Sequence, residues 1–150
     1  MTETQATVVA VNISSGGIPK HAIERGVVTP DGLEGDAHDH EKHNTPLQAI
    51  SLLDLEDLDD LRAEGFGVGP GATGENLTLR DLSVDELEVG ARLRFAGGVE
   101  LELTRRRKPC YVLDSIDPDL KTAARGRIGY YARVVAPGVI AAGESVDVVE

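Results

Sequence analysis

The sequence predicts a mostly β fold of short, mainly antiparallel strands with a few short helices, arranged as a β-barrel or a sandwich. Runs of β-branched and aliphatic residues recur along the chain with turn signals about every eight to twelve residues. The 17 glycines and 7 prolines are scattered through all 150 residues, and one segment has a clear helical pattern. No repeat or change in composition divides the chain, so we expect one domain spanning residues 1–150.

The first half of the chain contains three expected strands. Residues 8–13 and 27–29 are β-branched runs, which favour extended backbone because branched side chains pack well on a pleated surface. The first run ends at a Ser-Ser-Gly-Gly sequence and the second at Pro-Asp-Gly, which are strong turn signals. Residues 48–53 form the third expected strand.

A helix is expected over residues 54–64, directly after the third strand. Leu55, Leu58 and Leu61 recur at three-residue spacing with carboxylates between them, which is the pattern of an amphipathic helix. Gly65 is placed to end this helix, because glycine readily adopts the left-handed conformation that closes many helices.

The second half of the chain contains the remaining expected strands. A glycine-rich loop follows the helix and leads into an expected strand at residues 75–79. Residues 93–95 and 99–104, separated by Ala-Gly-Gly, predict a β-hairpin, and glutamates alternate with apolar residues along its second strand. The last strands are expected at residues 130–135 and 146–149.

The composition argues against several classes of partner. The chain has 26 acidic and 15 basic residues, a net charge of -11 and 3% aromatic residues. Such a surface repels phosphate backbones and offers little to stack on bases, so we expect no nucleic-acid partner. The first twenty residues lack a signal pattern and no run of 18 apolar residues occurs, so we expect no membrane insertion and a cytoplasmic protein.

Cys110 is the only cysteine in the chain, and it follows the most basic run of this acidic sequence. Residues 105–108 are three arginines and a lysine. Neighbouring cations stabilise the thiolate, which is the form that attacks electrophiles and binds soft metals. Pro109 suits the first position of a helix, whose positive end would have the same effect. The alternative is that a lone cysteine is simply a small buried apolar residue.

Three polar loops are further candidates. Thr73 and Asn76 lie in the segment Pro-Gly-Ala-Thr-Gly-Glu-Asn-Leu-Thr, residues 70–78, whose side chains and backbone amides can donate hydrogen bonds to a polar heterocycle or a phosphate. Ser14 and Lys20 follow the first strand. The histidine-rich segment 35–43 has metal-ligand residue types, but its spacing matches no known ligand motif, so we interpret it as a polar loop.

Taken in order, these pieces resemble the MOSC domain, the family named for the C-terminal domain of molybdenum-cofactor sulfurases. The resemblance extends from about Val9 to Val148, and it is that of a small stand-alone prokaryotic member. It is carried by residues 13–14, 17–20, 32–38, 70–78, 87–90, 108–110, 131–134 and 143–146.

The resemblance implies a β-barrel-like fold and a molybdenum–molybdopterin cofactor (Moco). Cys110 would be the molybdenum ligand or a carrier of sulfur. The other implied cofactor-binding residues are Lys108, Arg106, Thr73, Glu75, Asn76, Asp36, His38, Ser14 and Lys20. Side chains alternate along a strand, so either Arg106 and Lys108 or Arg105 and Arg107 should face the ligand, and the distance to Cys110 favours the first pair.

The function implied by the resemblance is sulfur transfer or Moco-dependent reduction of a small-molecule substrate. Related sulfurases and reductases carry extra domains that 150 residues do not accommodate. Sulfur would therefore come from a separate donor such as a cysteine desulfurase, or electrons from a separate electron-donor protein. The alternatives are a non-catalytic module that carries or delivers the cofactor, and a metal-free carbon–sulfur or thiol-handling enzyme on the same scaffold.

Overall fold

The mostly β class is confirmed by the computed structural model, which describes residues 5–15, 18–36, 46–109 and 111–149. The described strands form one eight-stranded and one three-stranded sheet. The paired strands are antiparallel except β5 and β6, which are parallel. In spatial order the large sheet consists of β11 (Val146–Val149), β7 (Arg92–Phe95), β8 (Glu100–Arg106), β9 (Tyr130–Ala136), β5 (Ile50–Asp54), β6 (Leu77–Arg80), β1 (Thr7–Ile13) and β2 (His21–Ile23).

The strands are divided between two sheets, and the large sheet does not close into a barrel. The small sheet consists of β10 (Gly138–Ala141), β3 (Arg25–Thr29) and β4 (Gly32–Leu33). β1 meets the segment before β11 through an isolated bridge between Thr7 and Ser145, and the Val8 N–H donates to the Glu144 carbonyl oxygen at 2.9 Å. One bridge is not a ladder, so the expected barrel is corrected to an open sheet.

Most of the expected strands are present, with small shifts at their ends. The expected hairpin is β7 and β8, with Leu93 opposite Leu101. The strand expected from residue 48 begins at Ile50, because Pro46–Gln48 form a 3-10 helix. Short strands β2, β4 and β10 were not predicted; β10 occupies a stretch that reads as a turn at Pro137 and Gly138.

The expected helix is α1 (Leu55–Ala63), and it links the parallel strands. Parallel neighbours cannot be joined by a tight turn, so the chain leaves β5, crosses through α1 and a glycine-rich loop, and returns as β6. Leu58 and Leu61 are the buried helix residues, as their spacing predicts. Gly65 follows the helix with φ of 102°, the left-handed conformation expected of it.

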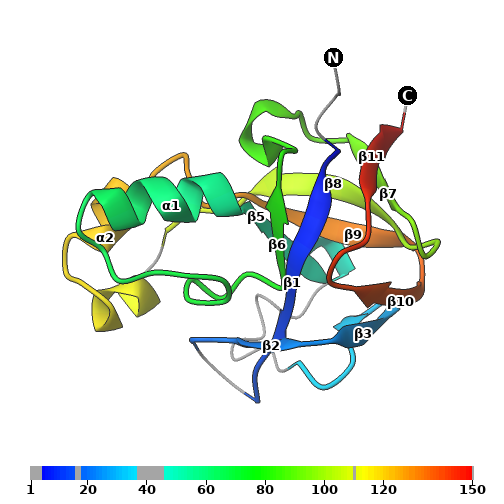
Figure 1. Ribbon diagram of the computed structural model, residues 1–150, viewed down its shortest axis with the longest axis horizontal. Coiled ribbons are helices and arrows are strands. Elements are labelled where there is room, and N and C mark those ends of the chain that lie inside the picture. The colour runs from blue at the N-terminus through cyan, green and yellow to red at the C-terminus, as the bar shows by residue number, and fades with distance from the viewer. Residues whose placement is uncertain (1–4, 16–17, 37–45, 110, 150) are drawn as a thin grey trace.

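Two hydrophobic clusters hold the fold together. The larger one is formed by the sheets and includes Phe95, Leu101 and Tyr130. The smaller one joins α1 to the short helix α2 (Leu120–Ala123) and the 3-10 helix Tyr111–Ser115; it includes Leu58, Leu61, Leu113, Leu120 and Ile128. Figure 1 shows α1 and α2 together at one end of the molecule, away from β3 and β10. Within the described residues, no helix is long and apolar enough to cross a membrane.

Candidate functional site: a basic cavity beside a buried polar network

A cavity of about 690 Å³ opens where β8 ends, beside α2 and the loop that leads into β9. Five of its lining side chains are cationic and one is a carboxylate. The lining residues are Asp85, Arg106, Arg107, Lys108, Pro109, Lys121, Thr122, Arg125, Gly126, Ile128 and Gly129. In a protein of net charge -11, this cavity concentrates positive charge at one place.

Gly129 lines the floor of the cavity at a position where no other residue fits. Gly129 has φ of 81°, and a Cβ atom there would lie 1.8 Å from the carbonyl oxygen of Leu52 in β5. The Arg107 N–H donates to the Gly129 carbonyl oxygen at 2.9 Å, which continues the β8–β9 pairing one residue past the end of β8. The glycine therefore lets the loop before β9 press against a core strand.

Arg106 and Arg107 are held by neutral groups. The Arg106 guanidinium donates to the carbonyl oxygen of Asp85 at 2.9 Å and lies 4.8 Å from the centre of the Tyr130 ring. The Arg107 guanidinium donates to the carbonyl oxygens of Thr73 at 2.9 Å and Ile128 at 3.0 Å. None of the ion pairs among the described residues includes a cation of the cavity. Their charge is therefore available to an anionic ligand.

The alternation of side chains along a strand predicted two of the five cations. Arg106 and Lys108 line the cavity, and Arg105 is not among the lining residues. Arg107 also lines it, because β8 ends at Arg106 and the alternation of side chains does not continue beyond the strand. Lys121 and Arg125 were missed; their only signal in the sequence is a pair of basic residues at i and i+4.

Cys110 and His38 lie outside the described residues. Pro109, which precedes Cys110 in the sequence, lines the cavity. Pro109 is not at the first position of a helix, since residues 107–109 have no regular structure and the 3-10 helix begins at Tyr111.

Glu75 is the centre of a buried polar network that borders the cavity. Its carboxylate is fully buried and accepts three hydrogen bonds: from the Thr73 hydroxyl at 2.7 Å, the Gly71 N–H at 2.8 Å and the Thr78 hydroxyl at 2.8 Å. These bonds fix the tight loop between α1 and β6. Thr73 in turn accepts from Arg107, so the loop and the cavity share one contact.

Asn76 and Asp36 extend this network to the first strand. The Asp36 carboxylate accepts from the Lys20 ammonium at 2.6 and 2.7 Å, from the Asn76 side-chain amide at 2.9 Å and from the Ser14 N–H at 2.9 Å. The Asp36 and Lys20 side chains are 2% and 10% exposed. The Asn76 side-chain oxygen accepts from the N–H of Ser51 in β5 at 3.0 Å.

The structure thus brings together six of the residues singled out in the sequence, but as partners of one another. Thr73, Glu75 and Asn76 are buried, and the hydrogen bonds of their side chains are made within the protein. The six residues are Ser14, Lys20, Asp36, Thr73, Glu75 and Asn76, and none of them lines the basic cavity.

The fold and the site together define a class: a small, mostly β protein with a cation-lined cavity that suits a compact anionic ligand. Comparison with known proteins makes this assignment specific. The family model of the MOSC domain matches residues 39–147. The chain therefore belongs to the MOSC domain family, as its sequence elements indicated.

Individual proteins are similar to this chain in sequence or in structure. A protein named "Reductase" from Gibberella moniliformis is 30% identical over 129 residues, which is 79% of this chain but 23% of that protein. The YuaD protein from Bacillus subtilis has a similar structure, with a TM-score of 0.80, 20% identity and coverage of 97% and 96% of the two chains. YiiM from Geobacillus stearothermophilus has a TM-score of 0.79, with 26% identity and coverage of 97% of this chain and 75% of that one.

Proposed function

We propose that this protein binds the molybdenum–molybdopterin cofactor at the basic cavity and uses Cys110 as the molybdenum ligand or as a sulfur carrier. The observation that carries the proposal is the cavity itself: five cations, none in an ion pair among the described residues, line a space that includes Pro109, the residue before Cys110.

The residues of the cavity suit the chemistry of this cofactor. The pterin carries a phosphate and the metal carries oxo groups, and guanidinium forks donate two parallel hydrogen bonds to such oxyanions. Arg106, Arg107 and Lys108 would hold the anionic groups from the β8 side, and Lys121 and Arg125 from the α2 side. The bound cofactor supplies a redox-active metal with affinity for sulfur, and Cys110 offers a soft anionic ligand.

The buried network is proposed to position the site from behind. The hydrogen bonds of Glu75, Asn76 and Asp36 fix the loop that carries Thr73, and Thr73 holds the Arg107 guanidinium at the cavity. In this proposal Thr73, Glu75 and Asn76 act by holding Arg107 in place, and not by the direct contacts with the cofactor that the resemblance implied. His38 remains a proposed residue at the rim.

Moco-dependent reduction and sulfur transfer are both compatible with this site. The name of the fungal relative, "Reductase", supports reduction of a small-molecule substrate, and this chain spans less than a quarter of that relative. Electrons would come from a separate donor protein, or sulfur from a separate cysteine desulfurase, in the cytoplasm. The remaining alternatives are a passive cofactor carrier and a metal-free enzyme acting on carbon–sulfur bonds or thiols.

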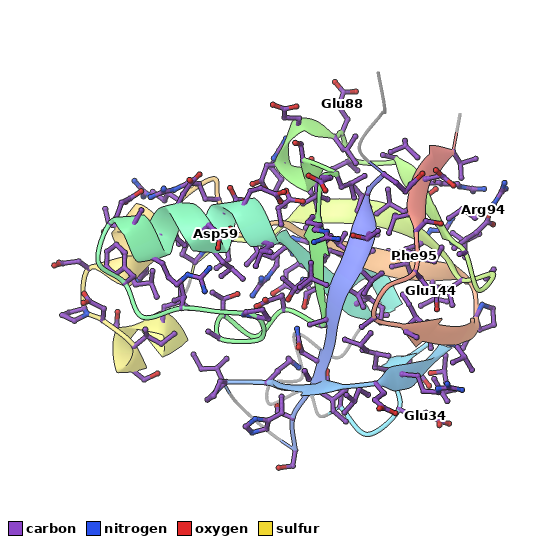
Figure 2. The ribbon with its side chains drawn as sticks, viewed as in Figure 1. Glu34, Asp59, Glu88, Arg94, Phe95 and Glu144 are labelled. Atoms are coloured by element: carbon purple, nitrogen blue, oxygen red, sulfur yellow. The ribbon has the colours of Figure 1, made fainter. Side chains whose placement is uncertain are left out.

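Metal and pterin analysis of protein purified from a molybdate-supplied host tests the proposal. We expect near-stoichiometric molybdenum and pterin in the native protein. A double variant, Lys121→Gln with Arg125→Gln, should retain pterin about tenfold less well, because two charged hydrogen-bond donors are lost. The matched control is Arg94→Gln, which removes an exposed arginine on β7 (Figure 2) that does not line the cavity, and it should retain the cofactor fully.

Cys110→Ser separates the role of the thiol from that of the cavity. We expect this variant to lose molybdenum or persulfide formation while it keeps its fold. A native protein that contains neither metal nor pterin would contradict cofactor binding and favour the metal-free enzyme. Turnover of an N-hydroxylated base by the loaded protein with a reductant would rule out a passive carrier.

A further inference from the structure

Three aspartates from two segments converge at the start of α1. Asp54 ends β5, Asp57 lies in the first turn of α1, and Asp85 belongs to the 3-10 helix Val84–Glu86. One carboxylate oxygen from each can be chosen so that all three lie within 4.8 Å of one another. We name this set the aspartate cluster. Asp85 also lines the basic cavity, so the two sites adjoin.

The Asp54 side chain is not used in the way its position predicts. An aspartate at a helix N-cap normally accepts a hydrogen bond from an N–H of the first turn. Asp54 is the N-cap of α1 but makes no side-chain cap hydrogen bond. One of its oxygens accepts from the Val84 N–H at 2.7 Å, and the other, Oδ1, is buried with no partner. The residue is 3% exposed, so bulk solvent hardly reaches this oxygen.

Asp57 also has an oxygen without a hydrogen-bond partner. Its Oδ2 is buried and accepts no hydrogen bond within the described part of the protein. None of the ion pairs among the described residues includes any member of the aspartate cluster. The positive end of α1 supplies only about half a charge. An orphaned carboxyl oxygen in a protein interior calls for either a bound cation or a proton.

Burial and neighbouring carboxyl groups raise the pKa of two members of the cluster. Burial, followed by the charge of Asp85, raises the pKa of Asp54 to about 7. Burial, followed by a hydrogen bond with Asp85, raises the pKa of Asp57 to about 9.

We propose that Asp54, Asp57 and Asp85 bind a hard divalent cation of the Ca²⁺, Mn²⁺ or Mg²⁺ class. Such ions take carboxylate oxygens at roughly 2.0–2.6 Å, so oxygens on opposite sides of one ion are separated by about 4–5 Å. The three chosen oxygens of the cluster lie within 4.8 Å of one another, which is inside this limit. The cation would lie at the edge of the basic cavity but is chemically separate from a soft metal held by sulfur.

Calorimetric titration of chelator-treated protein with each of Ca²⁺, Mg²⁺ and Mn²⁺ tests the proposal. We expect one cation per chain, and a rise in the melting temperature of roughly 5–10 °C when the cation is present at a hundred times its Kd. Asp54→Asn and Asp57→Asn should each weaken binding about tenfold or more, because a ligand charge is removed. The matched control is Asp59→Asn, which changes an exposed aspartate on the same helix (Figure 2) and should leave binding unchanged.

The outcomes separate a cation from a shared proton. Native affinity in both Asn variants, or no binding of any of the three cations at millimolar concentration, would overturn the proposal and assign the cluster to a proton shared between Asp57 and Asp85. Asp85→Asn provides a second test through the other segment. Because binding is measured without the pterin cofactor, the result is independent of the function proposed for the basic cavity.

Discussion

The network around Glu75 and the aspartate cluster both contain buried carboxylates, but they differ in how those carboxylates are satisfied. Glu75 and Asp36 accept hydrogen bonds from hydroxyl, amide, ammonium and backbone donors. Asp54 and Asp57 each keep a buried oxygen without a donor. A satisfied carboxylate is a structural part of the fold, whereas an orphaned one indicates a missing ligand or proton. Candidate residues should therefore be judged by their unmet hydrogen bonds as well as by their position.

Loss of the Lys20 ammonium should produce the largest change in this comparison. Lys20→Met keeps the approximate shape of the side chain but leaves Asp36 charged and buried. We expect the free energy of unfolding to fall by about 3–5 kcal/mol, as measured by urea denaturation. Adding Asp36→Asn should restore part of the loss. If Lys20→Met is as stable as the native protein, the ion pair is not part of the structural network.

Glu75→Gln should produce the next largest effect. The substitution removes the charge of the side chain and replaces one acceptor oxygen with an NH₂ group, so three charge-assisted hydrogen bonds become weaker bonds to a neutral amide. We expect a loss of about 2–3 kcal/mol in the same denaturation measurement. The control Glu88→Gln changes an exposed residue that projects away from the fold in Figure 2, and it should alter stability by less than about 0.5 kcal/mol.

Asp57→Asn should stabilise the protein, unlike the two preceding substitutions. In the presence of a chelator, the amide supplies a hydrogen-bond donor without the cost of protonating a carboxyl group whose pKa is raised to about 9. We expect the free energy of unfolding at neutral pH to rise by about 1 kcal/mol. A clear loss of stability in chelator would instead show that Asp57 already has a partner, and it would end the contrast with Glu75.

The exposed carboxylates provide a baseline for the buried ones. Hydrogen bonds from Arg133 and Arg92 lower the pKa of Glu102. A lowered pKa in the folded state adds stability above the unfolded-state value of about 4.3, and this stability is lost as the pH falls through the folded-state value. Glu102→Gln should therefore flatten the acid side of the pH–stability curve slightly and change the melting temperature at pH 7 by less than about 2 °C. A larger change would mean that surface ion pairs contribute as much as the buried network.

The sequence predicts those parts of the fold that depend on local pattern. The spacing of Leu55, Leu58 and Leu61 predicted α1, and the alternation after the Ala-Gly-Gly turn predicted the β7–β8 hairpin. β10 was missed because its first residue, Gly138, belongs to a turn signal, and its pairing with β3 depends on residues more than a hundred positions earlier. The sequence also could not show whether the sheet closes into a barrel, because closure depends on contacts between distant segments.

The candidate site divides in the same way. Arg106 and Lys108 could be named because the basic run is contiguous. Lys121 could not, because only the fold brings α2 beside the end of β8. The aspartate cluster was equally hidden, since Asp54 and Asp57 read as helix-start carboxylates and Asp85 lies 28 residues after Asp57. Asn76 shows the same dependence, because its side chain bonds to Ser51 and Asp36, which lie 25 and 40 positions earlier in the sequence.

The glycine at position 129 sets a limit on how this scaffold can change. Any side chain there would collide with the carbonyl oxygen of Leu52, so the floor of the cavity moves only if a central strand moves. The rim differs, because Lys108, Lys121 and Arg125 are exposed and make no ion pair among the described residues. These three residues can therefore be exchanged at little cost to stability, while the chain path beneath them is kept.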